Sequence, residues 1–167
     1  MKMISYNNEQ NGPVMSAAKK ALETGKAHHI LIWIPEASEN TLKNLLEKAC
    51  CERRIQMDGH NHIIDWYFAT VRRFHFVCYG PRNLNISIKR PEEKTIISLV
   101  EKACESGNFE EIATVIPDTP AGELRQRFND VMTKRNYGVE NIAAGRVYVS
   151  ASTDFIAFVN RLRSGSI

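Results

Sequence analysis

Two stretches of this 167-residue chain match each other at a constant offset of 82 residues, without a gap. The first stretch covers residues 15–50 and the second covers residues 97–132. Nine aligned positions are identical, on apolar helix faces and at helix-stop residues: Ser16/Ser98, Lys20/Lys102, Ala21/Ala103, Glu23/Glu105, Gly25/Gly107, Ile30/Ile112, Ile34/Ile116, Pro35/Pro117 and Leu42/Leu124. Because no catalytic residue type recurs among them, the pattern predicts a repeated fold rather than a repeated active site.

The first helix of each copy begins near a proline and ends at a glycine. Gly12-Pro13 starts the first one, since proline at the first turn loses no hydrogen bond, and Gly25 ends it. The second copy starts at Pro91 and ends at Gly107. Glycine tolerates the left-handed backbone that commonly closes a helix, so we expect both glycines to adopt positive φ.

The next segment of the first copy, residues 28–34, resembles a strand when it is considered alone. Its counterpart, residues 108–116, looks helical because Asn108 and Glu111 have the spacing of a capping box. Two copies of one unit share their structure, so we expect a short helix in both, closed by Pro35 and Pro117.

Longer helices complete each half, with apolar residues at helical spacing. The third helices are expected at about 38–53 and 119–134, and the fourth at about 62–77 and 141–163. The residues expected to face inward on the fourth helices are Ile63, Trp66, Tyr67, Thr70, Val71, Phe74 and Val77 in the first, and Tyr148, Ser152, Phe155, Val159 and Leu162 in the second.

These elements predict an all-α fold made of two tandem four-helix repeats. The halves run about 13–78 and 93–163, and residues 79–92 form the linker. Four helices cannot easily bury their apolar faces alone, so we expect the halves to pack about a pseudo-twofold axis. The whole chain, 1–167, is then a single domain, which suits its length.

Composition excludes several classes of protein. Hydrophobic residues make up 43% and charged residues 25% of the chain, as in ordinary globular proteins. A net charge of +3 with scattered basic pairs argues against nucleic acid as a partner. The polar N-terminus has no signal core, and we expect a cytoplasmic protein that does not bind a membrane. Four cysteines without a paired spacing are not a disulfide framework; Cys50 and Cys104 are expected to be buried.

Several motifs carry a resemblance to a known family: Gly-Pro-Val at 12–14, Ala-Leu-Glu-Thr-Gly at 21–25 and Leu-Ile-Trp-Ile-Pro at 31–35. With the segment 123–159, they resemble a bacterial and archaeal family of short proteins classed only as a domain of unknown function. Its members typically open with His-Cys-Asp before Asp-Gly-Pro-Val and carry a histidine in the fourth helix of each half. The resemblance implies a metal- or cofactor-binding centre where the N-terminus meets those two helices.

This chain departs from that family pattern at nearly every ligand position. Tyr6, Asn7 and Asn8 replace the His-Cys-Asp tripeptide, and Asn11 replaces the acid before Gly-Pro. The helical histidine of the first half is His75, but Ala157 occupies the position in the second half. We therefore expect no cofactor and no tightly bound metal.

Another group of ligand-type residues is His60-Asn61-His62 with Asp65. Histidine and carboxylate side chains bind zinc and related metals. The group follows Gly59, where loop and capping histidines are also common. A metal site at this group is therefore the alternative to a binding module without metal.

Our first hypothesis is a non-enzymatic helical module that binds an unknown small molecule or protein. The expected pocket lies near His75, Trp66 and Tyr6, in the crevice between the halves. The alternative is a metal- or cofactor-binding protein, with catalysis open, that uses His60, His62, Asp65 and His75. A P-loop, a dinucleotide fingerprint and the common hydrolase motifs are absent from the sequence, so it names no reaction.

Overall fold

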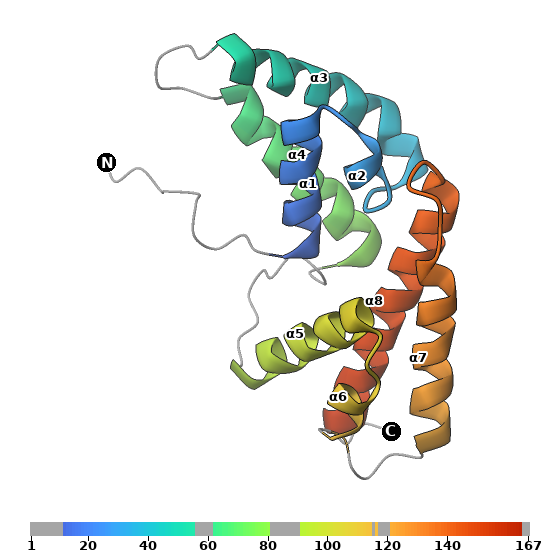
Figure 1. The fold of residues 1–167 in the computed structure, drawn as a ribbon. Coiled ribbons are helices and arrows are strands. Elements are labelled where there is room, and N and C mark those ends of the chain that lie inside the picture. Colours follow the sequence, from blue (N-terminus) through green and yellow to red (C-terminus); the bar gives the residue numbers. More distant parts are fainter. Residues whose placement is uncertain (1–11, 56–61, 81–90, 115, 117–120, 165–167) are drawn as a thin grey trace. The chain divides into compact units, whose positions relative to one another are not determined.

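A computed structural model describes residues 12–55, 62–80, 91–114, 116 and 121–164 (Figure 1). These residues contain eight α-helices and one 3-10 helix, and no strand, which confirms the all-α prediction. The chain divides into two compact units, Met1–Ile86 and Ser87–Ile167. The predicted linker, 79–92, lies largely outside the described residues, and the single domain over 1–167 stays a prediction. The elements are α1 Pro13–Thr24, α2 His28–Leu31, η1 Glu36–Ser38, α3 Glu39–Ile55, α4 His62–Tyr79, α5 Pro91–Ser106, α6 Glu110–Ala113, α7 Ala121–Arg135 and α8 Ile142–Ser164.

In unit 1, α1 packs against α2, α3 and α4, and α3 packs along α4. Each helix contributes an apolar stripe to the buried interior. Tyr67 of α4 is fully buried, and its hydroxyl donates a hydrogen bond to the Ala18 carbonyl of α1 at 3.1 Å. The buried residues of these helices are Val14, Met15, Ala18, Ala21, Leu22, Ile30, Leu31, Leu42, Leu45, Leu46, Ala49, Tyr67, Val71 and His75.

The segment after α1 confirms the short helix that we expected instead of a strand. Residues 28–31 form α2, and the amide of Trp33 donates to the Ile30 carbonyl at 3.0 Å. Ile30 and Ile34 are fully buried, so the apolar run serves the core through a helical turn. Pro35 then leaves the helical conformation with ψ of 147° and begins η1.

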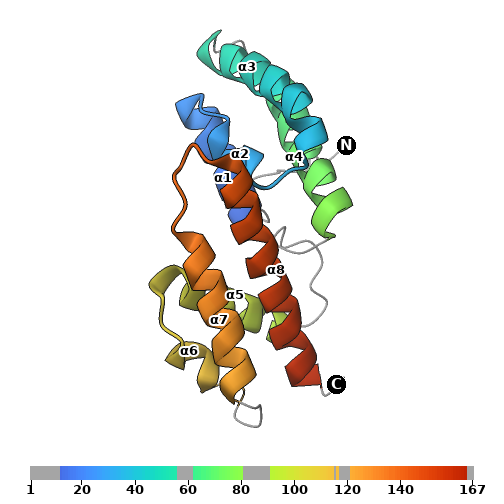
Figure 2. The ribbon, with the colours of Figure 1, turned by 90° about the vertical axis from the view of Figure 1, so that its right-hand side faces the viewer.

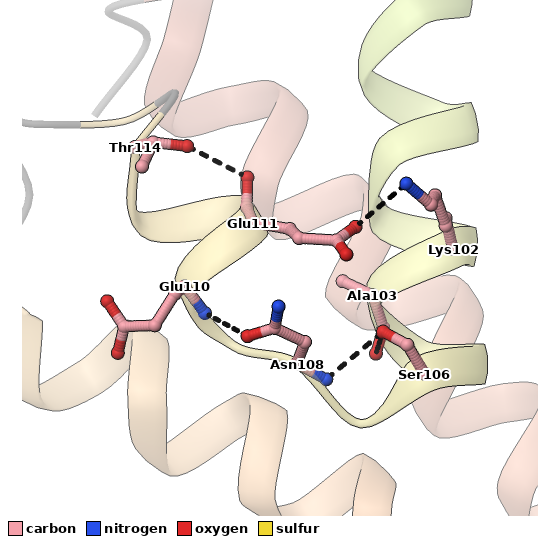
Figure 3. Close-up of polar contacts among 7 residues, drawn as sticks. All are labelled: Lys102, Ala103, Ser106, Asn108, Glu110, Glu111 and Thr114. Atoms are coloured by element: carbon pink, nitrogen blue, oxygen red, sulfur yellow. Dashed lines mark hydrogen bonds and ion pairs between the residues drawn. The ribbon is translucent and has the colours of Figure 1, made fainter.

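The turns that end α1 and α5 have the same local structure. Gly25 has φ of 69° and Gly107 has φ of 76°, which confirms both predicted left-handed ends. The residue after each glycine donates its amide to the hydroxyl of the residue before it. The distance is 3.3 Å from Lys26 to Thr24 and 3.2 Å from Asn108 to Ser106 (Figure 3).

The predicted capping box between Asn108 and Glu111 does not form at the start of α6, where Phe109 is the N-cap residue and has no side-chain cap bond. The Asn108 side-chain oxygen accepts the amide of Glu110 at 3.2 Å. Glu111 does not return to the Asn108 amide, which is occupied by Ser106; it pairs instead with Lys102 at 3.7 Å (Figure 3). The contact joins α6 to α5.

In unit 2, α8 packs along α7 and against α5, while α5 also contacts α6 and α7. Three phenylalanines form a chain through this core. The ring centroids of Phe109 and Phe128 are 5.5 Å apart, and those of Phe128 and Phe155 are 6.0 Å apart. Such tilted aromatic pairs add to the free energy gained by burial. The order of the helices is visible from a second side in Figure 2.

Helix α8 also passes a test of length and composition for membrane spans, over Ile142–Arg163. Its Phe155, Ile156 and Val159 lie in the core of unit 2. A helix buried in a protein core passes the same test, so the test alone does not assign α8 to a membrane.

Two predictions about inward-facing residues are wrong for α4. Trp66 is 61% exposed and Val77 is 75% exposed, whereas Tyr67 and Val71 are fully buried. The cause is that α4 carries apolar residues around most of its circumference, so periodicity alone does not choose the face. Of the cysteines expected to be buried, Cys104 is buried but Cys50 is only half-buried.

Candidate functional site

His75, the family-like histidine, lies within unit 1 and is fully buried. Its Nδ1 atom is 2.8 Å from the carbonyl oxygen of Trp33. A carbonyl can only accept a hydrogen bond, so Nδ1 carries the proton. In a neutral ring, Nε2 then holds the lone pair and can act as an acceptor or a ligand.

Two aromatic side chains surround His75. The Tyr79 ring, one helical turn further along α4, stacks on it with centroids 4.9 Å apart and an interplanar angle of 29°. The Trp33 ring lies 6.1 Å away at 58°. The histidine is thus held on two sides by rings and through Nδ1 by the backbone.

The structure separates Trp66 from His75, although we expected both near one pocket. Nine residues separate them on α4, which is two and a half turns and therefore places them on opposite faces. Trp66 is exposed and His75 is buried. Tyr6, the third residue expected there, lies outside the described residues.

The residues of the alternative metal site are also spread along the chain. His62 and Asp65 are exposed in the first turn of α4, and His60 lies outside the described residues. His62 and His75 are thirteen residues apart on one helix, about 20 Å at 1.5 Å per residue, so one ion cannot bind both. Within the described ranges, no three histidine, cysteine, aspartate or glutamate side chains are grouped to hold a metal ion.

Unit 2 contains a cluster of polar groups that the sequence did not reveal, on α5 and α8. Burial and, to a lesser extent, the negative charge of Glu105 together raise the pKa of Glu101 to about 7. One carboxylate oxygen of Glu101 is buried and has no hydrogen-bond partner among the described residues. The only signal in the sequence was a glutamate three residues before Cys104, on the apolar side of α5.

The Cys104 thiol lies near Glu101, and the Tyr148 phenol lies near Cys104. Burial raises the pKa of Cys104 to about 11, a rise that Arg135 opposes and Glu101 adds to. Burial also raises the pKa of Tyr148, and the nearby Ser152 hydroxyl partly offsets this. Ser152 lies close to the phenol, but its hydroxyl makes no hydrogen bond of good geometry within the described part of the chain. The whole cluster favours neutral, protonated groups.

A groove of about 320 Å³ lies between α7 and α8. Lys134 Nζ and Asp130 Oδ2 form an ion pair of 2.6 Å at its side. The Arg127 guanidinium is paired with Glu123 at 2.9 Å and lies 4.2 Å from the centre of the Phe158 ring. The residues that line the groove are Arg127, Asp130, Lys134, Val147, Ser150, Ala151, Asp154 and Phe155.

The lining of this groove mixes charged, polar and apolar side chains. It contains two cations and two carboxylates, and the Ser150 hydroxyl can donate or accept a hydrogen bond. Phe155 and Ala151 supply apolar surface between the charges. Concave sites of this size hold small molecules in many proteins.

Residues 11–158 match a protein-family model described as a family of unknown function, DUF6448. The match covers most of the chain, and the protein belongs to this family. No curated protein and no solved structure matches it. Membership confirms the family resemblance in its coarse form, that of a family of unknown function.

Proposed function

We propose that this protein is a non-enzymatic helical binding module that holds a small zwitterionic molecule between α7 and α8. The observation that carries the proposal is the groove itself, with two cations, two carboxylates and the apolar Phe155 in its lining. Its side chains come from two long helices that pack along each other, which holds them in fixed positions.

The protonation states of the buried thiol and phenol in unit 2 support a binding function rather than catalysis. A cysteine acts as a nucleophile through its thiolate. The pKa of Cys104, at about 11, keeps its thiol protonated at neutral pH, and Tyr148 is shifted in the same direction. These shifts oppose nucleophilic catalysis by the buried groups.

The proposal is tested by titrating the isotope-labelled full chain with small zwitterions, such as amino acids and betaines, and following its amide NMR signals. We expect shifts in the signals of groove residues and their loss in Ser150→Trp, because Ser150 lines the groove and is exposed. Asn129→Trp is the matched control, on an exposed residue of α7 that does not line the groove. Shifts that persist in Ser150→Trp, or no shifts with any probe, contradict the proposal.

We also propose that the two units descend from one four-helix unit, as the sequence repeat predicts. Moving α2, His28–Leu31, by 82 residues gives the bounds of α6, Glu110–Ala113. The same step moves the start of α3 to the start of α7 and the end of α1 to the end of α5. The shared glycine turns add independent support. A pseudo-twofold packing of the halves stays a prediction.

A second candidate function, metal or cofactor binding, is favoured by one observation at His75. Histidines that bind metals commonly donate their other ring N–H to a carbonyl or carboxylate, as Nδ1 does to Trp33. The group His60, His62 and Asp65 would be a separate site, of which His62 and Asp65 are exposed. Elemental analysis of the untagged protein distinguishes this candidate from the groove. A cytoplasmic location stays an expectation.

A further inference from the structure

Helix α4 has a continuous exposed face opposite its buried one. Trp66 is 61% exposed, Phe76 52% and Val77 75%, which is unusual for large apolar side chains on one helix. The exposed residues of this face, which we call the α4 face, are His62, Asp65, Trp66, Ala69, Arg73, Phe76 and Val77.

The spacing of the α4 face is that of a helix that packs along another helix. Steps of four and three residues lead from His62 through Trp66, Ala69 and Arg73 to Phe76. Residues at these steps stay on one side of the helix. The eighteen residues of α4 make this side about 27 Å long.

Charge on the α4 face is arranged with opposite signs at equal distances from Ala69. Asp65 lies four residues before Ala69 and Arg73 lies four residues after it, so each is about 6 Å from it along the axis. Two antiparallel copies related by a twofold axis at Ala69 therefore bring the carboxylate of each chain level with the guanidinium of the other. The small side chain of Ala69 lets the two backbones approach there.

The same twofold arrangement gives each aromatic residue of the face a partner on the second copy. Arg73 of the second copy comes beside Trp66, three residues before the axis, where a guanidinium can stack on the indole ring. His62, seven residues before Ala69, comes level with Phe76 of the second copy, seven residues after it. A face that complements itself in this way meets the requirement for a closed dimer.

We infer that the α4 face is an interface with a second copy of this chain, joined as an antiparallel, twofold-symmetric helix pair. Burial of the apolar side chains supplies the attraction, and the Asp65–Arg73 pairs set the direction and register. The inference concerns unit 1 alone and is independent of the groove in unit 2.

The test is sedimentation velocity of the full chain over a range of concentrations, with three variants of the α4 face. Asp65→Arg and Arg73→Asp each place like charges level with each other, so each should raise the dimer dissociation constant at least about tenfold. Combining them restores opposite charges, and the double variant should return to within about threefold of the wild type.

Two controls accompany the series. Glu47→Arg changes an exposed charge on α3 and should leave the dimer intact. Far-ultraviolet dichroism of every variant checks that the helices are retained, as expected for substitutions of exposed residues. A wild-type chain that stays monomeric at all concentrations overturns the inference. A dimer dissociation constant that neither single charge reversal changes also overturns it. So does a double variant that dimerises as weakly as either single variant.

Discussion

The Nδ1 atom of His75 lies 2.8 Å from the carbonyl oxygen of Trp33, a bond that ties α4 to the segment after α2. In His75→Leu the carbonyl loses this donor in a buried place. We expect a loss of about 1–3 kcal/mol in the free energy of unfolding, measured by urea denaturation. His75→Asn retains an N–H donor and should lose less. Equal stability of His75→Leu and the wild type would show that the bond contributes nothing.

Gly25 and Gly107 should tolerate a side chain poorly. Their φ values of 69° and 76° disfavour β-branched residues, so Gly25→Val and Gly107→Val should each lower stability by about 1 kcal/mol or more. Gly122→Ala is the control, because this glycine lies inside α7 with open space around it. That variant should gain about 0.5–1 kcal/mol in thermal unfolding. Tolerance of valine at both turns would contradict the assignment.

The sequence predicted the helices well because their ends carry specific residues. Gly25, Gly107 and Pro13 restrict the backbone locally, and the repeat allowed one copy to correct the other over residues 28–34. Local chemistry of this kind acts whatever the neighbouring helices do.

The choice of buried face on α4 could not be predicted in the same way. Tyr67 and Val71 lie on one side, and Trp66, Phe76 and Val77 lie on the other, with enough apolar surface for either to be the core. The decision depends on α1 and α3, which are distant in the sequence. The pKa of Glu101 depends likewise on burial within unit 2, which a single helix pattern does not contain.

Glu101 should make stability depend on pH. Burial raises its pKa from the ordinary 4.5 to about 7, so the folded state binds this proton more tightly than the unfolded state. The stabilisation that this bound proton provides is fully present below the pKa of Glu101 in the unfolded state, and it is lost as the pH rises through 7. Glu101→Gln stays neutral and should therefore be more stable than the wild type at about pH 8. The gain is on the order of 1 kcal/mol, since solvent screens a partly exposed carboxylate.

A second variant separates the two causes of this shift. Glu105→Gln removes the neighbouring charge and keeps the burial, so the pH dependence should remain with its midpoint moved to lower pH. Urea denaturation at a series of pH values measures both variants. A wild-type profile that matches Glu101→Gln across this range would show that the carboxyl titrates normally.

The four cysteines should react at very different rates in the folded protein. Cys104 is buried and its pKa is raised from 9.0 to about 11, which leaves about a hundredfold less thiolate than an ordinary cysteine. Cys51 and Cys78 are exposed and should be alkylated first. Cys50, half-buried with a raised pKa, should react at an intermediate rate.

Pulse labelling with iodoacetamide and peptide mass spectrometry measures the order in which the cysteines react. Unfolding in urea should abolish the differences. Early labelling of Cys104 in the native protein would contradict the buried cluster.

The final prediction is that the purified, untagged protein retains no stoichiometric transition metal after dialysis against a chelator. Stable sites of this kind generally need three or four convergent protein ligands. At the positions where the resemblance implies a ligand set, this chain offers His75 together with Tyr6, Asn7, Asn8 and Ala157. Phenol and amide groups are weak ligands for zinc or copper. His62 and Asp65 lie about 20 Å and about 15 Å away along α4, so they cannot complete a site at His75. Elemental analysis and thermal unfolding before and after dialysis make the test.

One zinc, iron or copper ion per chain, with a loss of stability when it is removed, would contradict the prediction. If His62→Ala still bound this ion and His75→Ala did not, the metal alternative at His75 would be established.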